Sequence, residues 1–107
     1  EEVGGEGALF ALRSLSAPPA VCVALEIGPA TPDAPLFLDD TPTMWINDSY
    51  AAMSPDDITH VHAAAAQSGG VGVQSQVVTR GGSDATCAAS HGLCARPVTL
   101  AFGAENS

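Results

Sequence analysis

Residues 21–27, with the sequence VCVALEI, decide the fold class of this chain. Glu26 is the one polar residue in a run that is otherwise apolar. Such a run is typical of a strand that is buried on both faces, as in a parallel sheet covered by helices. We therefore predict an α/β fold built around this strand.

Helix and strand patterns alternate along the rest of the chain. Ser54 and Pro55 precede two Asp residues and predict a helix start, because each residue type suits its position in a first turn. Alternating valines from Val71 to Val77 favour a strand. The expected helices are 8–15, 55–67 and the segment from Ser83 to Gly92, and the expected further strands are 43–47, 71–78 and 97–102, with a proline-rich loop at 29–42. This order predicts a mainly parallel sheet flanked by helices.

The size and charge of the chain limit its functions. The 107 residues suffice for one small domain. Twelve Asp and Glu oppose three basic residues, giving a net charge of −9. Because phosphate backbones and anionic membranes attract basic surfaces, we expect no nucleic-acid or membrane partner. The acids suit a divalent cation, although a solubilising surface explains most of them.

The three cysteines, Cys22, Cys87 and Cys94, do not form the paired pattern of a disulfide framework. They also lack zinc-finger spacing. A reducing, cytoplasmic location is therefore expected.

Four acids stand where strands are expected to end. Glu26 lies near the end of its strand, Asp84 follows the next long strand, and Glu1-Glu2 would join them if they also end a strand. Functional groups of open parallel sheets gather at the carboxyl ends of the strands. Taken alone, Glu26 fits a structural ion-paired or hydrogen-bonded residue better than a metal ligand, Asp84 fits a helix cap, and adjacent glutamates fit a surface.

Three sequence strings change this balance. EEVGGEGA at 1–8 resembles the EEVGxxGA segment of the tetrahedral (TET) aminopeptidases, which belong to family forty-two of the metallopeptidases in clan MH. VALEIG at 23–28 is similar to the family's apolar strand that ends in an acidic metal ligand, although that acid is usually Asp. GGSDA at 81–85 resembles the family's GGTDA. The strings occur in the family's order and span most of the chain.

The resemblance implies a two-metal aminopeptidase that removes N-terminal residues from short peptides. Glu1 matches the general base, Glu2 a ligand of one metal and Glu26 a ligand of the other. Asp84 matches a residue close to the metals that binds neither of them. The implied cofactors are two divalent ions, zinc or alternatively cobalt or manganese, and the implied assembly is a large homo-oligomer.

The family's site also requires residues that are not in this sequence. The resemblance implies a His and a bridging Asp before Glu1, and a further His after Ser107. The chain also opens without methionine. We therefore expect residues 1–107 to be the C-terminal part of a metallopeptidase catalytic domain, and to be inactive alone.

Two alternatives remain. Paired carboxylates also serve glycoside hydrolases, but one Trp and one Tyr offer few platforms for sugar rings. A non-catalytic relative could instead retain the fold as a binding or assembly module. His60 and His62 do not decide between these alternatives, because residues two apart on a helix point in different directions. His91 suits a helix end, and Arg80 could pair with one of the acids.

Overall fold

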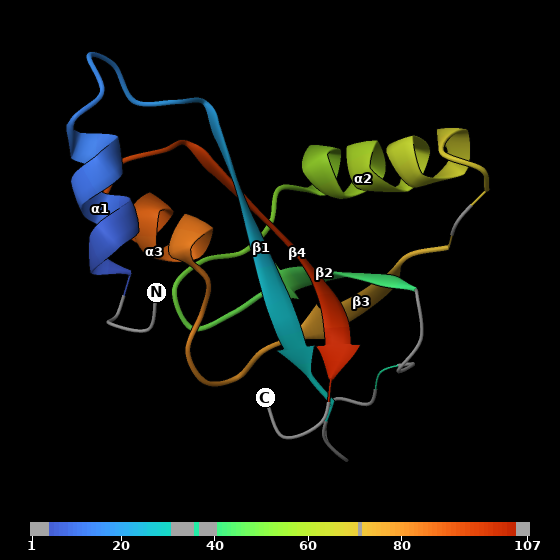
Figure 1. Ribbon diagram of the computed structural model, residues 1–107. Coiled ribbons are helices and arrows are strands. Elements are labelled where there is room, and N and C mark those ends of the chain that lie inside the picture. Colours follow the sequence, from blue (N-terminus) through green and yellow to red (C-terminus); the bar gives the residue numbers. More distant parts are fainter. Residues whose placement is uncertain (1–4, 31–35, 37–40, 71, 105–107) are drawn as a thin grey trace.

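The computed structural model of the chain describes residues 5–30, 36, 41–70 and 72–104. Its helices and strands follow the predicted order, so the α/β fold is confirmed (Figure 1). The elements are α1 (Glu6–Arg13), β1 (Val21–Pro29), β2 (Pro42–Asn47), α2 (Pro55–Gln67), β3 (Gln74–Val77), α3 (Asp84–Ser90) and β4 (Arg96–Ala104).

The four strands form one sheet in the order β1-β4-β2-β3. β1 and β4 are parallel from Val21↔Arg96 to Pro29↔Ala104, and β2 and β3 are also parallel. The central pair, β2 and β4, is antiparallel. Two of the three pairings are parallel, so the prediction of a mainly parallel sheet is confirmed. The antiparallel pair divides the sheet into two halves that run in opposite directions.

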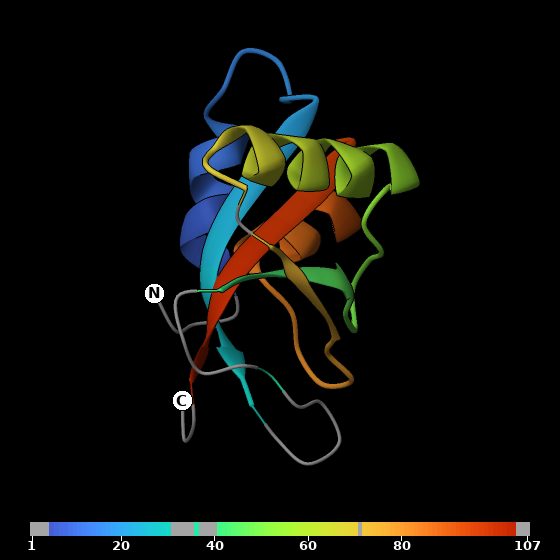
Figure 2. The same ribbon diagram turned by 90° about the vertical axis from the view of Figure 1, so that its right-hand side faces the viewer.

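The helices cover both faces of the sheet. Figure 2 shows α2 in front of the sheet, with α1 and α3 behind it. Separate apolar clusters fill the two layers. The α1/α3 layer contains Leu9, Cys87, Ala88 and Cys94, with Leu12, Cys22, Ala89 and Leu93 packed against them. The α2 layer contains Met44, Met53 and Val98, with Val21, Ile46, Ile58, Val61, Val73 and Leu100 packed against them.

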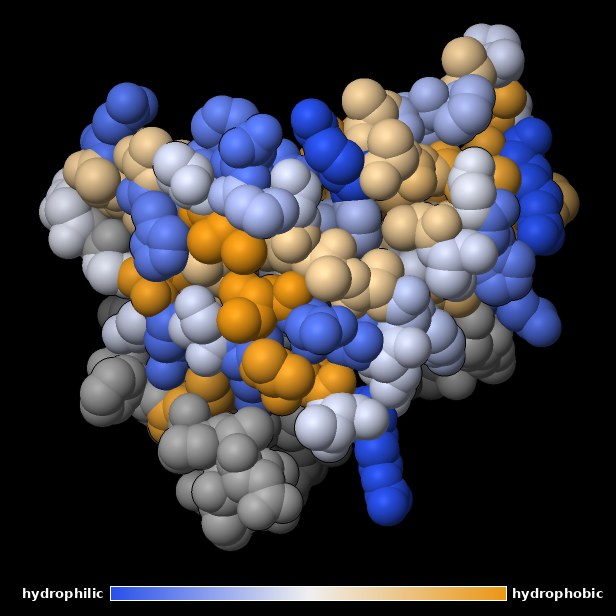
Figure 3. Space-filling view, turned by 180° about the vertical axis from the view of Figure 1, so that it is seen from behind, coloured by the Kyte–Doolittle hydropathy of each residue, from blue (hydrophilic) through white to orange (hydrophobic). Residues whose placement is uncertain are grey.

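The expectation that β1 is buried on both faces is wrong. Val23, Leu25 and Ile27 are exposed, and Leu25 keeps 83% of its surface accessible. β1 lies at the edge of the sheet, and α2 leaves part of this face open. Hydrophobic side chains are also exposed on the face of the molecule seen from behind (Figure 3).

The starts of α2 and α3 are capped differently from expectation. Ser54 occupies the cap position of α2, but its hydroxyl makes no capping hydrogen bond. At α3 the cap is Ser83, whose hydroxyl accepts from the Thr86 amide, while the Thr86 hydroxyl accepts from the Ser83 amide. Asp84 is the first residue of the helix and does not cap it, so the capping interpretation of Asp84 was wrong.

β3 is shorter than the predicted strand at 71–78. Val71 lies outside the described residues. Gln76 points inward and is 4% exposed, whereas Val77 is half exposed. Gln76 lies opposite Trp45 of β2, and its Oε1 would be 3.0 Å from a Cβ at Gly28 of β1. Its side chain is therefore packed against residues distant in sequence, and the alternation of valines does not contain that information.

Candidate functional site

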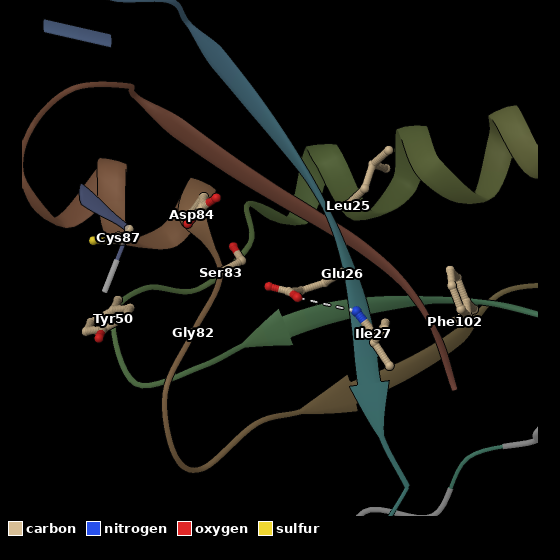
Figure 4. A pocket seen from close by; sticks show the side chains of 10 residues that line it. Leu25, Glu26, Ile27, Tyr50, Gly82, Ser83, Asp84, Cys87 and Phe102 are labelled. Atoms are coloured by element: carbon tan, nitrogen blue, oxygen red, sulfur yellow. Dashed lines mark hydrogen bonds between the residues drawn. The ribbon is translucent and has the colours of Figure 1, made fainter. Parts of the chain in front are cut away.

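Glu26 lies on β1 opposite Ala101 of β4, three residues before the strand ends. Its side chain extends from the sheet toward the start of α3, the direction of Ser83 and Asp84 (Figure 4). It is partly exposed, and its Oε1 accepts a long 3.4 Å hydrogen bond from the Ile27 amide. Glu26 makes no ion pair within the described part of the chain, so of the structural roles expected for it only the hydrogen bond, to the Ile27 amide, is present.

Asp84 shares a half-open cavity of ≈ 520 Å³ with Glu26. The walls come from β1, β4, the start of α3, the loop after β2 and Gly5 at the start of α1. Ser83 adds a hydroxyl beside the two acids, and its Oγ lies 2.6 Å from the Thr99 Oγ1 of β4. The cavity therefore combines two carboxylates with a rigidly held helix start.

The start of α1 packs closely against this site. Gly5 has a φ of +77°, and a Cβ at this position would lie 3.0 Å from the Cys87 Sγ and 3.5 Å from the Asp84 Oδ1. The left-handed backbone and the close approach both favour glycine. Gly5 thus brings the N-terminal end of α1 to the cavity wall.

Glu1 and Glu2 lie outside the described residues. Their expected roles as general base and metal ligand remain predictions. Gly5, the first described residue after them, lines the cavity.

Glu26 and Asp84 do not lie close together for the reason that was predicted, so that part of the prediction was wrong. A common edge of carboxyl strand ends was expected to unite Glu26 with Asp84. However, β3 precedes Asp84 and runs opposite to β1, because the two halves of the sheet meet at an antiparallel pair. The two acids share a cavity because α3 packs against the face of the sheet from which Glu26 extends.

Tyr50, Gly82 and Asp48 are site features that sequence reasoning missed. Tyr50 and Gly82 line the cavity, and Asp48 lies behind them as a 9% exposed carboxylate. The available signal was the polar segment Asn47-Asp48-Ser49-Tyr50 directly after a short predicted strand.

Metal-binding capacity is partial within the described residues. Carboxylate oxygens suit hard divalent ions, so the loosely bonded Glu26 carboxylate fits such a ligand. However, no group of three or more His, Cys, Asp or Glu residues is arranged for a metal within 5–30, 36, 41–70 and 72–104. Glu26 and Asp84 alone would leave most coordination positions to other groups.

The remaining polar candidates lie elsewhere. The His91 Nδ1 lies 3.0 Å from the Cys87 carbonyl oxygen at the end of α3, and His60 is within 3.9 Å of Asp57. Arg80 pairs with no acid in the described segments, whereas Arg96 pairs with Asp57 at 3.4 Å. None of the three cysteines, which all lie in the described residues, forms a disulfide. Burial raises the pKa of the Cys94 thiol, and Cys22 adds to the effect.

Solved structures share the fold of this chain. PhTET1, determined as a dodecamer, aligns with 99% of the chain at a TM-score of 0.79 and 25% identity. The TET1 peptidase of Pyrococcus horikoshii, which can assemble into a tetrahedron or a large octahedral shell, aligns with 99% at a TM-score of 0.70 and 26% identity. This chain is TET-like. A TET aminopeptidase of a marine sediment archaeon, Thaumarchaeota archaeon SCGC AB-539-E09, shares the fold at a TM-score of 0.78 over 96% of the chain and 23% identity.

The TET-like chain spans only part of these structures. It covers 31% of the PhTET1 chain, 31% of the Pyrococcus horikoshii chain and 29% of the archaeal aminopeptidase. No protein-family model and no curated protein matches the sequence significantly. None of the helices within the described residues is long and apolar enough to span a membrane.

Proposed function

We propose that the TET-like chain contributes to a metal-dependent aminopeptidase that acts on short peptides. The observation that carries this proposal is the shared cavity of Glu26 and Asp84 in a chain that aligns with TET aminopeptidases over nearly its full length. Glu26 would hold one divalent ion and Glu2 the other, while Asp84 would orient neighbouring groups without binding a metal. Zinc is the proposed metal, with cobalt and manganese as alternatives.

The bound ions would supply two kinds of chemistry, polarisation of the peptide carbonyl and a lower pKa for the attacking water. The residues of this chain would do the rest. Glu1 would accept the proton from that water as general base, and it would later donate the proton to the leaving amine. The short α3 and its Ser83 cap would hold Asp84 in place beside Glu26.

The partners of this proposed enzyme follow from the same relatives. Peptides are the proposed substrates, and a homo-oligomer is the proposed assembly, in line with the dodecamer and the tetrahedron formed by the matched proteins. A cytoplasmic location is proposed because the three cysteines, all within the described residues, form no disulfide.

A non-catalytic relative is the second candidate. It is favoured by the absence of a three-ligand group from the described part of the chain, which does not include Glu1 and Glu2. A module of this kind would retain the fold without binding metal through Glu26.

A hybrid enzyme tests the proposal. This chain would replace the matching segment of PhTET1, and the purified hybrid would be assayed with aminoacyl-anilides in zinc, cobalt or manganese. We expect metal-dependent hydrolysis that Glu26→Gln lowers at least about 100-fold, because mutating even the outer residues that orient metal ligands typically costs about 10–100-fold. Glu6→Gln, which removes an exposed acid from α1, is the matched control and should leave the rate unchanged. An assembled hybrid that hydrolyses nothing in any metal would support the non-catalytic relative.

The chain alone provides a second measurement. Without the further ligands that the family site requires, the purified 107 residues should not turn over an aminoacyl-anilide, with or without zinc or cobalt. Robust turnover would contradict the expectation of an incomplete site.

A further inference from the structure

The loop after β2 holds its backbone in one fixed shape. The Asp48 Oδ1 accepts hydrogen bonds from the amides of Tyr50 and Ala51, at 2.9 and 3.1 Å. The Asp48 amide in turn donates to the Ala51 carbonyl at 3.0 Å, and Asn47 forms a bridge with Ala52. These bonds fix the direction in which the Tyr50 side chain leaves the loop.

A second set of bonds ties this loop to the segment that leads into α3. The Ser49 amide donates to the Gly81 carbonyl at 3.0 Å, and the Ser49 hydroxyl donates to the Thr79 carbonyl at 3.2 Å. The loop bearing Tyr50 and the segment bearing Asp84 are therefore joined directly. Tyr50 keeps its position relative to the acids of the cavity.

The Tyr50 ring lies against Gly82. A Cβ at Gly82 would come within 2.5 Å of the Tyr50 Cδ2 and within 2.9 Å of the Asp48 Oδ2. Only a residue without a side chain leaves this space to the ring. The other half of the tyrosine side chain is open, with 49% of its surface exposed, and it lines the cavity with Glu26 and Asp84 (Figure 4).

We propose that Tyr50 is a substrate-positioning residue whose ring packs against the side chain of the first residue of a bound peptide. This inference rests on the proposed aminopeptidase function, in which the nearby acids and their metals would hold the reacting end of the peptide. A tyrosine suits the role because its ring offers a large apolar contact with few rotatable bonds. One side of the Tyr50 ring also packs against Gly82. The cavity would therefore favour peptides that begin with a bulky apolar residue over peptides that begin with glycine.

The test uses the fact that Tyr50 is the only tyrosine of the chain. The full chain, labelled with carbon-13 in its tyrosine ring, would be titrated by NMR with leucinamide and with glycinamide in zinc. We expect the Tyr50 ring signals to shift with leucinamide, and its dissociation constant to be about three- to tenfold lower than that of glycinamide, the factor that one aromatic contact provides.

Variants identify the ring as the cause. Tyr50→Ala should abolish the preference for leucinamide, while Tyr50→Phe should keep it, because the contact uses the ring and not the hydroxyl. Phe10→Ala is the matched control, since Phe10 is an exposed aromatic residue on α1 outside this cavity. Ring signals that stay fixed while other signals report binding would overturn the role of Tyr50 and leave the peptidase proposal intact, as would a preference that survives Tyr50→Ala. Binding of neither amide would overturn the role of Tyr50, whereas the peptidase proposal is decided separately by the hybrid enzyme. The labelled wild-type titration needs no variant, so it decides the question even if Tyr50→Ala does not fold.

Discussion

The Ser83 hydroxyl lies 2.6 Å from the Thr99 hydroxyl, in a buried layer between α3 and β4. Both residues are almost inaccessible, and Ser83 also caps the helix that begins with Asp84. This contact fixes the start of α3 on the same face of the sheet from which Glu26 extends. The relative position of the two cavity acids therefore depends on a pair of small hydroxyl residues.

Ser83→Ala should lower the free energy of unfolding by about 2 kcal/mol, because it removes a helix cap worth about 1 kcal/mol and a buried hydrogen bond worth about 1 kcal/mol. Thr99→Val should cost only about 1 kcal/mol, since Ser83 keeps its bond to the Thr86 amide. Urea unfolding measures both changes. The control is Ser68→Ala at the exposed end of α2, expected within about 0.5 kcal/mol of wild type. Equal effects of Ser83→Ala and Ser68→Ala would contradict the assigned role of Ser83.

Asp57 and Arg96 connect α2 to the first residue of β4. The Asp57 side chain is 7% exposed and the Arg96 side chain 47%, with 3.4 Å between the Oδ2 and the Nε. An exposed pair contributes at most about 1 kcal/mol, and a broken buried pair costs about 3–5 kcal/mol. Because only one partner is buried, we expect Arg96→Gln to cost about 1–2 kcal/mol in urea unfolding. Arg80→Gln, which removes an exposed arginine without an acidic partner in the described residues, should be neutral. A cost for Arg96→Gln that vanished in about 1 M salt would indicate a purely surface interaction.

Local signals predicted part of the fold well. The helix 55–67 was predicted at its observed bounds, because Ser54 and Pro55 mark its start and the glycines after Gln67 mark its end. β1 was also recognised from its apolar run. What no local pattern showed was the open face of β1, since which part of a sheet a helix covers depends on contacts between distant segments. The buried Gln76 is a similar case, because its side chain packs near Trp45 of β2 and Gly28 of β1, which are distant in sequence.

The candidate site was predictable to a smaller extent. Glu26 and Asp84 were expected close together and do share a cavity, although the antiparallel junction between β2 and β4 removes the edge that was expected to unite them. Tyr50 was missed because its place depends on Gly82, thirty-two residues later, and on hydrogen bonds between two loops. Sequence spacing contains no signal for a contact of this kind.

The cysteines should differ in reactivity and in their effect on stability at high pH. Cys22 is half-buried whereas Cys87 and Cys94 are buried, so a thiol reagent such as DTNB should modify Cys22 first in the folded protein.

Burial raises the pKa of the Cys94 thiol above its ordinary value of 9.0, so the folded state favours the protonated form. The contribution of the protonated Cys94 thiol to the free energy of unfolding is fully present below pH 9, and it is lost as the pH rises through the raised pKa.

Urea unfolding at about pH 8 and about pH 10.5 should therefore show a larger loss of stability for wild type than for Cys94→Ala. The comparison is made between the two proteins because every other group is common to both and contributes equally to the loss. Equal losses in wild type and variant would show that Cys94 does not control stability at high pH.

Gly82→Ala should disturb the wall of the cavity. The new Cβ would meet the Tyr50 Cδ2 at 2.5 Å, the Thr86 Oγ1 at 2.8 Å and the Asp48 Oδ2 at 2.9 Å. Two of these neighbours are buried, so only the Tyr50 ring has room to move. We expect a loss of about 1–3 kcal/mol in the free energy of unfolding, typical of overpacking, together with a shift of the Tyr50 ring signals in NMR.

Gly72→Ala is the matched control, because a Cβ there meets nothing within 4 Å and its φ lies outside the left-handed region. It should be neutral or stabilise the chain by up to about 1 kcal/mol. A Gly82→Ala protein with wild-type stability and unshifted Tyr50 signals would show that the ring is not held against Gly82, and it would remove the physical basis for a fixed wall at this side of the cavity.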